Sequence, residues 1–395
     1  MNILIYTQWQ NYLGYTVGGA ETSLRMLAEK LAEHGHNVHF LTELKEGRRY
    51  KKREETINGV SVHFVNLPDL PTKGIGLLLK VRSAYIEYKF AKTAEKIIGD
   101  HAIDLVHTYH EVPGMYRFLQ LKERKNLNYA TVLRNGGKFW VKQLRENPDL
   151  RDAYRYVFNS VDSVNFNTPG METLFDEACS ELRFDVDLEH RFVHDIGLNL
   201  ENAGHHWQLP EQRVPFKMIM ASRFSTHQKR QRLLVEAVAK LPKEMQWELY
   251  LVGEGPTKKS IRQLVVDKGL EDKIRFYGFL EQEKLWGLMK SCHLYVHACD
   301  FEGLSKIIIE AMVMGVPVLA SDVVPLRDYI NDGDTGFLVE NNATSWEDKI
   351  FALAQRPEKL TAVSMPAKKY VEDHFSADNN VKAYLEYFKK ILAGQ

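Results

Sequence analysis

The segment NILIYTQWQNYLGYTVGGAETSLRMLAEKLAEHGHNVHFLT, residues 2–42, has the pattern of a strand, a helix and a second strand. Its two ends, NILIYT and NVHFLT, are short apolar runs of the kind seen in parallel strands buried on both faces. Between them Leu24, Leu27 and Leu31 recur at helical spacing, and Gly35 follows as a typical helix end. A βαβ unit at this place predicts a doubly wound α/β fold.

The same alternation continues in two series. The first series contains the strand candidates VSVHFVNL, DLVHTYH, YATVLRN and SVNFNT, and the second contains FKMIMASRF, WELYLVGEG, IRFYGFL, LYVHAC and PVLASDV. A polar stretch with Gly and Pro separates the two series and is typical of a linker. We therefore expect an N-terminal domain over residues 1–196, a linker over 197–214, a second domain over 215–375 and a C-terminal amphipathic helix over 376–395.

Length and composition agree with two domains. The chain has 395 residues, of which 44% are hydrophobic and 26% charged, and its formal net charge is zero. A single core rarely grows beyond about 250–300 residues. The absence of net positive charge argues against a general nucleic-acid binder. Three cysteines without metal-ligand spacing, no signal-peptide pattern and no run of about 18 apolar residues predict a cytoplasmic protein.

Two short stretches near predicted strand ends are suited to phosphate. Gly18 and Gly19 lie in TVGGAE, just before the first helix, where glycines let the backbone approach an anion; a flexible turn is the alternative. The spacing is not G-x-G-x-x-G, so nicotinamide binding is poorly supported. Arg223 and Lys229 follow a later strand, six residues apart, and could neutralise a diphosphate; a solvated basic loop is the alternative.

A third stretch, FEGLSKIIIEAMVMGVPVLA, residues 301–320, predicts a buried helix between Ser305 as N-cap and Gly315. Glu310 lies inside this apolar helix and requires a strong hydrogen-bond partner, either ribose hydroxyls or a structural backbone N–H. The backbone N–H groups at Gly303, Leu304 and Ser305 would favour an anion at the helix N-terminus. Glu302, just before them, could accept hydrogen bonds from sugar hydroxyls. Taken together, these stretches indicate a nucleotide-sugar site.

These motifs resemble those of the retaining glycosyltransferases of family 4, which have the GT-B fold. The resemblance covers almost the whole chain and rests on GGAE, the Arg223/Lys229 pair, LVGEGP, FYGFL and the EGLSKIIIEAMVMGVPVLASDV stretch, with the later NDGDTGFLVE. It implies two Rossmann-like domains facing a central cleft and a C-terminal helix that crosses back to the N-terminal domain.

The resemblance also implies a role for each matching residue. Glu310 would bind the ribose and Glu302 the donor sugar, while Arg223 and Lys229 would hold the diphosphate. Gly18 and Gly19 would face the diphosphate from the N-terminal domain, and Gly303, Leu304 and Ser305 would add backbone donors. Phe279 and Leu280 would lie against the base. His110, in VHTYHEVPG, matches a histidine placed beside the donor sugar; a structural histidine is the alternative.

The implied reaction transfers a sugar from a UDP- or GDP-sugar to an acceptor hydroxyl with retention, in cell-surface polysaccharide or glycolipid synthesis. The triplets at residues 185–187 and 332–334 have the Asp-x-Asp pattern of a metal site. Neither follows a strand at the expected phosphate site, so we expect no metal and no other cofactor. The acceptor would be a glycan, a glycolipid or a small molecule.

The acceptor side is expected in the N-terminal domain. Residues 45–100 contain twelve Lys or Arg and seven Asp or Glu, a local net charge of +5, beside aromatic and apolar residues. Such a surface suits an anionic membrane at the inner face, and an ordinary solvated amphipathic helix is the alternative.

Other functions remain open at this point. A GT-B fold also serves nucleotide-sugar epimerases and sugar phosphorylases, although the basic pair and the spacing of the two glutamates argue against both. A non-catalytic sugar-nucleotide-binding protein would share the cleft. An exported sugar-binding protein would need a signal sequence.

Overall fold

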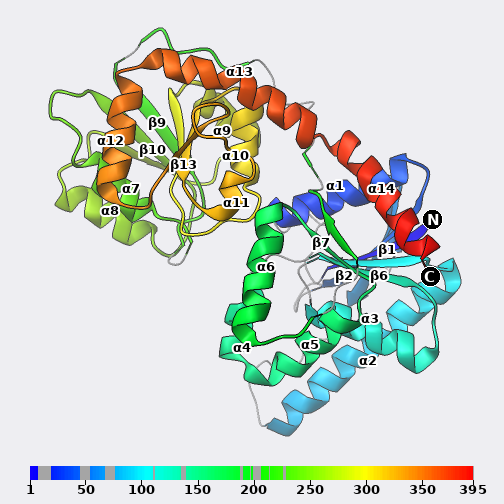
Figure 1. Ribbon diagram of the computed structural model, residues 1–395. Coiled ribbons are helices and arrows are strands. Elements are labelled where there is room, and N and C mark those ends of the chain that lie inside the picture. The colour runs from blue at the N-terminus through cyan, green and yellow to red at the C-terminus, as the bar shows by residue number, and fades with distance from the viewer. Residues whose placement is uncertain are drawn as a thin grey trace. The chain divides into compact units, whose positions relative to one another are not determined.

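The computed structural model describes residues 1–7, 19–44, 54–66, 76–109, 112–134, 139–186, 190–195, 197–198, 206–212, 214–225 and 228–394. The chain divides into two compact units. Unit 1 contains Met1–Leu198 and Ala377–Gln395, and unit 2 contains Asn199–Ser376. Each unit is an α/β structure built around its own sheet (Figure 1).

The sheet of unit 1 has eight strands in the order β3-β4-β2-β1-β5-β6-β7-β8. The strands are β1 Asn2–Thr7, β2 Asn37–Leu44, β3 Glu54–Ile57, β4 Val60–Asn66, β5 Leu105–Tyr109, β6 Ala130–Arg134, β7 Ser163–Phe166 and β8 Arg191–Val193. β3 pairs antiparallel with β4, and the other pairs are parallel. The predicted βαβ unit is therefore present, since β1 pairs with β2 in register Asn2 to Asn37.

Helices bury both faces of this sheet. They are α1 Gly19–Glu33, α2 Gly76–His101, α3 Val112–Lys125, α4 Phe139–Glu146, α5 Arg151–Ser160, α6 Pro169–Leu182 and α14 Ala377–Ala393, with a 3₁₀ turn at Pro148–Leu150. Side chains alternate along β1, so Ile3 and Ile5 pack with α1 and α14, whereas Leu4 and Tyr6 pack with α2 and α3. The near-continuous apolar strands follow from this burial on two faces.

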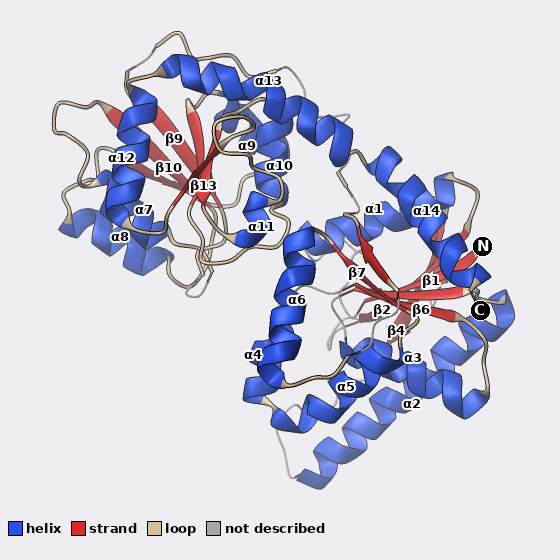
Figure 2. Cartoon of the chain, viewed as in Figure 1, coloured by secondary structure: helices blue, strands red, loops and turns tan. Residues whose placement is uncertain are grey.

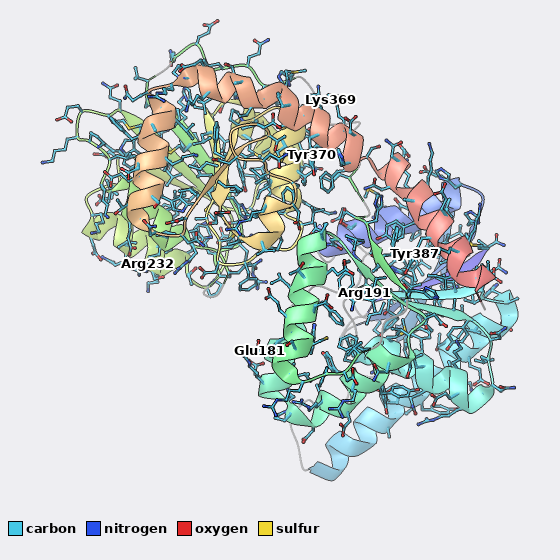
Figure 3. All side chains as sticks on the ribbon, viewed as in Figure 1. Glu181, Arg191, Arg232, Lys369, Tyr370 and Tyr387 are labelled. Carbon is cyan, nitrogen blue, oxygen red and sulfur yellow. The ribbon has the colours of Figure 1, made fainter. Side chains whose placement is uncertain are left out.

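The C-terminal helix α14 belongs to unit 1, as predicted. Its Tyr384 hydroxyl donates to Asn165 Oδ1 at 2.7 Å and accepts from the buried Arg134 at 3.0 Å. Tyr387, labelled in Figure 3, also lies on α14, and its ring stacks on Phe192 of β8 with centroids 4.0 Å apart. These contacts fix the last helix against the carboxyl-terminal half of the unit 1 sheet.

The sheet of unit 2 has six parallel strands in the order β11-β10-β9-β12-β13-β14. The strands are β9 Phe216–Ala221, β10 Trp247–Val252, β11 Ile274–Tyr277, β12 Leu294–His297, β13 Val318–Ser321 and β14 Phe337–Val339. The helices are α7 Gln231–Val238, α8 Lys258–Asp267, α9 Gln282–Lys290, α10 Lys306–Val313, α11 Val324–Arg327, α12 Ala343–Ala354 and α13 Pro357–His374. Figure 2 shows α7, α8 and α12 on one side of these strands and α9, α10 and α11 on the other.

Every quoted strand candidate contains a strand in the structure, whereas the short strands β3, β8 and β14 were not predicted. Part of the polar stretch before β9 also packs into unit 2. Trp207 is 3% exposed, and its indole donates to the carbonyl of Cys292 at 2.8 Å. Among the described helices, none combines the length and the apolar character that crossing a bilayer requires.

Candidate functional site

The strand order of unit 2 reverses direction between β9 and β12, which is where a ligand is expected to bind. The chain proceeds from β9 to one side of the sheet through β10 and β11, and to the other side through β12, β13 and β14. Ligands of open α/β sheets bind beyond the carboxyl ends of the strands at such a reversal. Arg223 and Lys229 follow β9, and Glu302 follows β12, so three predicted residues come from the two strands that flank this position.

Backbone contacts hold the two loops together. Lys229 and Cys299 form an isolated antiparallel bridge. Arg230 N donates to Ala298 O at 2.9 Å, and Asp300 N donates to Gln228 O at 2.9 Å. The segment that carries Lys229 is therefore fixed to the segment that leads to Glu302, which places their side chains side by side.

Lys229 and Glu302 form an ion pair between Nζ and Oε2, and each side chain is only 11% exposed. Gln228 Nε2 donates to the other carboxylate oxygen at 3.2 Å. Burial opposes ionisation of Glu302, but the charge of Lys229 outweighs it and lowers the pKa of Glu302 to about 2. The carboxylate is thus an anion at any physiological pH.

His297, the last residue of β12, is a third member of this group that sequence reasoning missed. Its Nε2 lies 2.9 Å from Lys229 Nζ, and its Nδ1 lies 3.0 Å from the Tyr295 hydroxyl. Because that hydroxyl donates to Ala221 O at 3.1 Å, it accepts from Nδ1–H, which leaves the Nε2 lone pair for Lys229. Complete burial, followed by the charge of Lys229, lowers the pKa of His297 to about 4, so the ring is neutral.

Two cationic groups of this site can still bind a ligand. An ammonium group has three N–H donors, and the contacts with Glu302 and His297 use two of those of Lys229. The side chain of Arg223 is exposed, and within the described part of the chain it makes no side-chain hydrogen bond or ion pair. A phosphate group would therefore find one ammonium donor already oriented and one exposed guanidinium.

The motif LVGEGP has a structural reason at this position. Gly253 and Gly255 have φ angles of 134° and 152°. A Cβ at these residues would lie 2.2 Å from Ser222 O and from Phe224 O, respectively, so only glycine allows this approach. Lys258, which sequence reasoning also missed, donates to the carbonyls of Gly253 and Tyr277 at 2.9 Å each. The β10 loop thereby supports the backbone on both sides of Arg223.

Glu310 lies on α10, the helix predicted from Ser305 to Gly315. Its Oε2 accepts from the indole of Trp286 at 2.8 Å, and its Oε1 from Gln282 Nε2 at 3.4 Å. Burial raises the pKa of Glu310, partly offset by the hydrogen bond from Trp286. The partner is thus an indole on α9, not the backbone N–H that the structural interpretation named, and the carboxylate remains partly exposed.

One of the backbone donors predicted at the N-terminus of α10 has a partner within the protein. Ser305 is the N-cap residue, but its side chain makes no capping hydrogen bond. Its amide donates to the hydroxyl of the buried Tyr329 at 3.2 Å. This amide therefore already has a protein partner, whereas contacts of an anion with Gly303, Leu304 and Ser305 stay predictions.

The other predicted residues lie as follows. Phe279 is 66% exposed in the loop between β11 and α9, and Leu280 beside it is half-buried. Gly19 is the first residue of α1, after β1. Gly18 and His110 lie outside the described residues. They adjoin α1 and β5, and β1 and β5 flank the corresponding reversal of strand order in the unit 1 sheet.

Two groups of candidate metal ligands occur in unit 2. Asp332 of the second Asp-x-Asp triplet accepts from Leu338 N at 2.9 Å and from Lys349 at 3.1 Å, so this turn is structural. His297, Cys299 and Glu302 lie close enough to ligate one ion. The ammonium of Lys229 already contacts two of these ligands, and an ion would have to displace it.

Each of the two units matches a family model of known proteins. Residues 203–370 match the family model Glycosyl transferases group 1, and residues 17–179 match Glycosyltransferase Family 4. N-acetyl-alpha-D-glucosaminyl L-malate synthase of Bacillus anthracis is 24% identical over 391 residues, which cover 95% of each chain. Poly(ribitol-phosphate) alpha-N-acetylglucosaminyltransferase of Staphylococcus aureus is 24% identical over 276 residues, covering 66% of this chain and 52% of that protein.

Solved structures show the same fold. Sucrose-phosphate synthase from Thermosynechococcus elongatus superposes with a TM-score of 0.79 at 19% identity, covering 100% of both chains. HepE of Anabaena, solved with UDP and glucose, superposes with a TM-score of 0.73 at 20% identity, covering 99% of this chain and 100% of that one. The predicted fold class is confirmed.

Proposed function

The chain belongs to the family 4 glycosyltransferases of the GT-B fold, and we propose that it transfers a sugar from a nucleotide diphosphosugar to an acceptor hydroxyl with retention of configuration. The relatives from Bacillus anthracis and Staphylococcus aureus support a place in polysaccharide or glycoconjugate synthesis. UDP is the favoured nucleotide, with GDP as the alternative, because the structural relative HepE binds UDP.

One observation carries the proposal. Lys229 and Glu302 meet at the strand-order reversal of unit 2, where a cation for a diphosphate and an anion for sugar hydroxyls are both required. Neither charge needs to be created or moved when a donor arrives. Preorganised charges of this kind stabilise a transition state without a reorganisation cost.

The roles follow from the charge that develops in the reaction. Glycosyl transfer passes through an oxocarbenium-like transition state, and negative charge accumulates on the departing diphosphate. Lys229 and Arg223 would stabilise that charge, with the amides of Gly303 and Leu304. Glu302 would accept from the donor sugar hydroxyls. The departing phosphate oxygen would take the proton of the attacking acceptor hydroxyl, on the same face, with His110 beside the sugar.

The nucleotide would occupy the adjoining region of unit 2. Glu310 is held by Trp286 and retains an exposed side, which suits the two ribose hydroxyls. The exposed ring of Phe279, with Leu280 beside it, offers a surface for the base. The diphosphate would then extend toward Arg223 and Lys229, with Gly18 and Gly19 of unit 1 as further backbone contacts.

We propose that the reaction needs no metal ion or other cofactor. The ammonium of Lys229 supplies the positive charge that a divalent cation supplies in other transferases. Activity should persist after treatment with a chelator, and strict dependence on Mn²⁺ would contradict this assignment.

We further propose that unit 1 meets an anionic membrane surface while it binds its acceptor. α2 places Lys89 over the ring of Tyr85 and Lys92 over that of Tyr88, and the Tyr88 side chain is 58% exposed. The same helix borders a groove of about 1000 Å³ that Tyr116, Leu150 and Lys125 also line. Exposed aromatic and basic side chains suit a headgroup layer. Co-sedimentation with anionic vesicles in moderate salt tests this, and an absence of binding contradicts it.

The transfer itself is tested by donor and acceptor screening. A thermal-shift screen over nucleotide diphosphosugars identifies the donor, because a ligand of the folded state raises Tm with concentration. The donor is then mixed with candidate acceptors, release of UDP or GDP is measured, and NMR defines the anomeric configuration of the product. Retention supports the proposal. An epimerised donor would support a nucleotide-sugar epimerase, and phosphorolysis would support a sugar phosphorylase. Tight binding without turnover would support a non-catalytic sugar-nucleotide-binding protein.

A further inference from the structure

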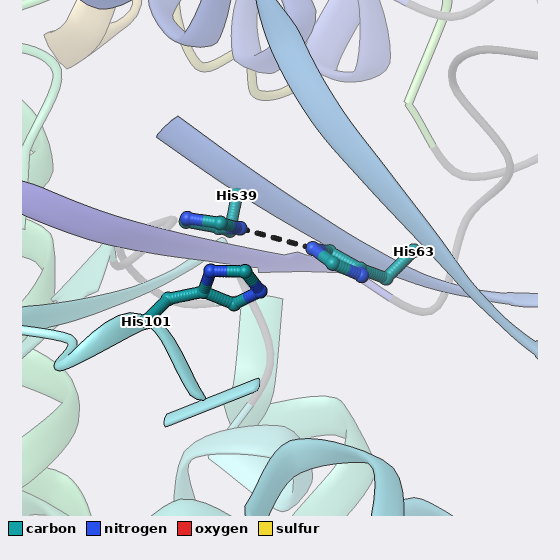
Figure 4. A group of neighbouring side chains, drawn as sticks. All are labelled: His39, His63 and His101. Carbon is teal, nitrogen blue, oxygen red and sulfur yellow. Dashed lines mark hydrogen bonds between the residues drawn. The ribbon is translucent and has the colours of Figure 1, made fainter. Parts of the chain in front are cut away.

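Three histidines from separate elements of unit 1 meet at one place, far from the candidate site in the chain. His39 lies on β2, His63 lies on β4, and His101 is the last residue of α2. His39 Nδ1 lies 3.0 Å from His63 Nε2, and the ring centroid of His101 lies 4.1 Å from that of His39. Figure 4 shows the His101 ring facing the His39–His63 pair. One ring nitrogen from each residue lies within 4.8 Å of the others.

The positions of these side chains call for an explanation. His39 and His63 are 6% and 5% exposed, and they lie on the sheet face that α2 covers. Their neighbours on that face, Leu41 and Val65, belong to the apolar core. Burying a polar ring without full compensation is unfavourable, and two aliphatic side chains would pack here without that cost. A single hydrogen bond leaves other ring nitrogens of the cluster available to a ligand.

The surroundings of His63 suit a metal-bound imidazole. His63 turns Nδ1 toward Glu54 Oε2 at 3.7 Å, which leaves Nε2 on the side of the cluster. A carboxylate behind a histidine is the usual outer partner of a metal-bound imidazole.

We propose that His39, His63 and His101 bind one zinc ion, with water as the fourth ligand. Two nitrogens on one tetrahedral zinc lie about 3.3 Å apart, because each Zn–N bond is about 2.0–2.1 Å. The 3.0 Å separation of His39 Nδ1 and His63 Nε2 needs only a small widening, in which the ion replaces their hydrogen bond. Imidazole ligands suit zinc better than magnesium or calcium, which prefer oxygen.

The location indicates what the ion does. His39 is the third residue of β2, His63 is in the middle of β4, and His101 ends the helix that leads back to β5, so the cluster lies away from the carboxyl ends of β2 and β4. The carboxyl ends of the strands are the ligand edge of such a sheet. The zinc ion would therefore join β2, β4 and the end of α2 as a structural link, and transfer would not pass through it.

The test uses full-length chain without a histidine tag, stripped of metal with a chelator that is then removed. Zn²⁺ is titrated in competition with a chromophoric chelator, and Co²⁺ is added separately to record its visible absorption. We expect one equivalent of zinc and a tetrahedral cobalt spectrum with nitrogen ligands. Zinc should also raise the Tm of the stripped protein.

His101→Gln is the decisive variant, because His101 is only partly buried and its replacement leaves the strand positions intact. We expect its zinc affinity to fall at least about tenfold and the zinc-induced rise in Tm to disappear. His34→Gln, which replaces an exposed histidine on the same unit, is the matched control and should change neither. Glu302→Gln should also retain the zinc equivalent. Absence of a stoichiometric zinc site, or a site that Glu302→Gln abolishes and His101→Gln leaves intact, would overturn the proposal.

Discussion

The ammonium of Lys229 contacts the carboxylate of Glu302 although the two residues lie 73 positions apart in the chain. The pair bridges the loops after β9 and β12, and His297 Nε2 lies 2.9 Å from Nζ and 3.0 Å from Oε2. Both charges are largely withdrawn from water. Their interaction is therefore stronger than that of a solvent-exposed ion pair. The following predictions start from this arrangement.

Replacing Lys229 with alanine should reduce kcat about 100-fold with a smaller change in the donor KM. The reason is that its contact with the diphosphate strengthens as charge develops on the leaving group. Steady-state release of the nucleoside diphosphate measures both constants. Arg232→Ala is the matched control, because this cation on α7 is exposed and pairs only with Glu236 among the described residues (Figure 3). Equal kcat values in wild type and Lys229→Ala would remove Lys229 from the mechanism.

Glu302 should make the stability of unit 2 depend on pH in the acid range. Its pKa is lowered from 4.5 to about 2, so the stability it contributes is present above about pH 4.5 and is lost as the pH falls toward 2. A shift of this size corresponds to a few kcal/mol at most. Denaturant unfolding at about pH 6 and about pH 3.5 should show a smaller difference for Glu302→Gln than for wild type. Identical differences would show that the carboxylate is not held as an anion.

Glu310→Gln should weaken donor binding and leave the thermal stability nearly unchanged. The amide oxygen can still accept from the Trp286 indole, so Tm should change little. Loss of the charge should weaken nucleotide binding about tenfold, since hydrogen bonds to a charged group are the stronger ones. Calorimetric titration with UDP measures this. Glu310→Ala should lower both affinity and Tm, because it leaves the Trp286 N–H unsatisfied, and unchanged UDP affinity in both variants would exclude a ribose contact.

Gly255→Ala should destabilise unit 2 by about 1–3 kcal/mol and weaken donor binding together. The new Cβ would lie 2.2 Å from Phe224 O, at a φ of 152°, and would displace the backbone next to Arg223. Gly287→Ala is the control, because this glycine lies within α9 with no atom within 4 Å of the added Cβ. It should be neutral or stabilising. Equal Tm values for the two variants would mean that the β10 loop does not constrain Arg223.

The sequence predicts the fold well because its signals are local and repeated. Apolar runs such as NILIYT indicate strands whatever their neighbours, and Ser305 and Gly315 delimit α10 correctly. β8 and β14 have three residues each, which are too few positions for a period to emerge. Trp207 lies in a stretch rich in polar residues, glycine and proline, and this average composition concealed its burial.

The site was only partly predictable, because its partners come from distant parts of the chain. The motif identified Lys229 and Glu302 but not His297, whose role depends on the pairing of β9 with β12. Nothing in the local sequence around Glu310 indicates that Trp286, 24 positions earlier, donates to it. Ser305 N–H was assigned to an anion because helix termini generally favour one, whereas Tyr329 from a later turn occupies it.

The most direct measurement is the binding of the donor to unit 2 in the whole chain. Isothermal titration of wild type and the Arg223→Ala/Lys229→Ala double variant with UDP, GDP and their sugars compares the two proteins at one site. We expect one equivalent of a single nucleotide type to bind wild type and affinity to fall at least about 100-fold in the double variant. Binding of equal strength in both proteins, or none in wild type with any nucleotide diphosphosugar, would contradict the account.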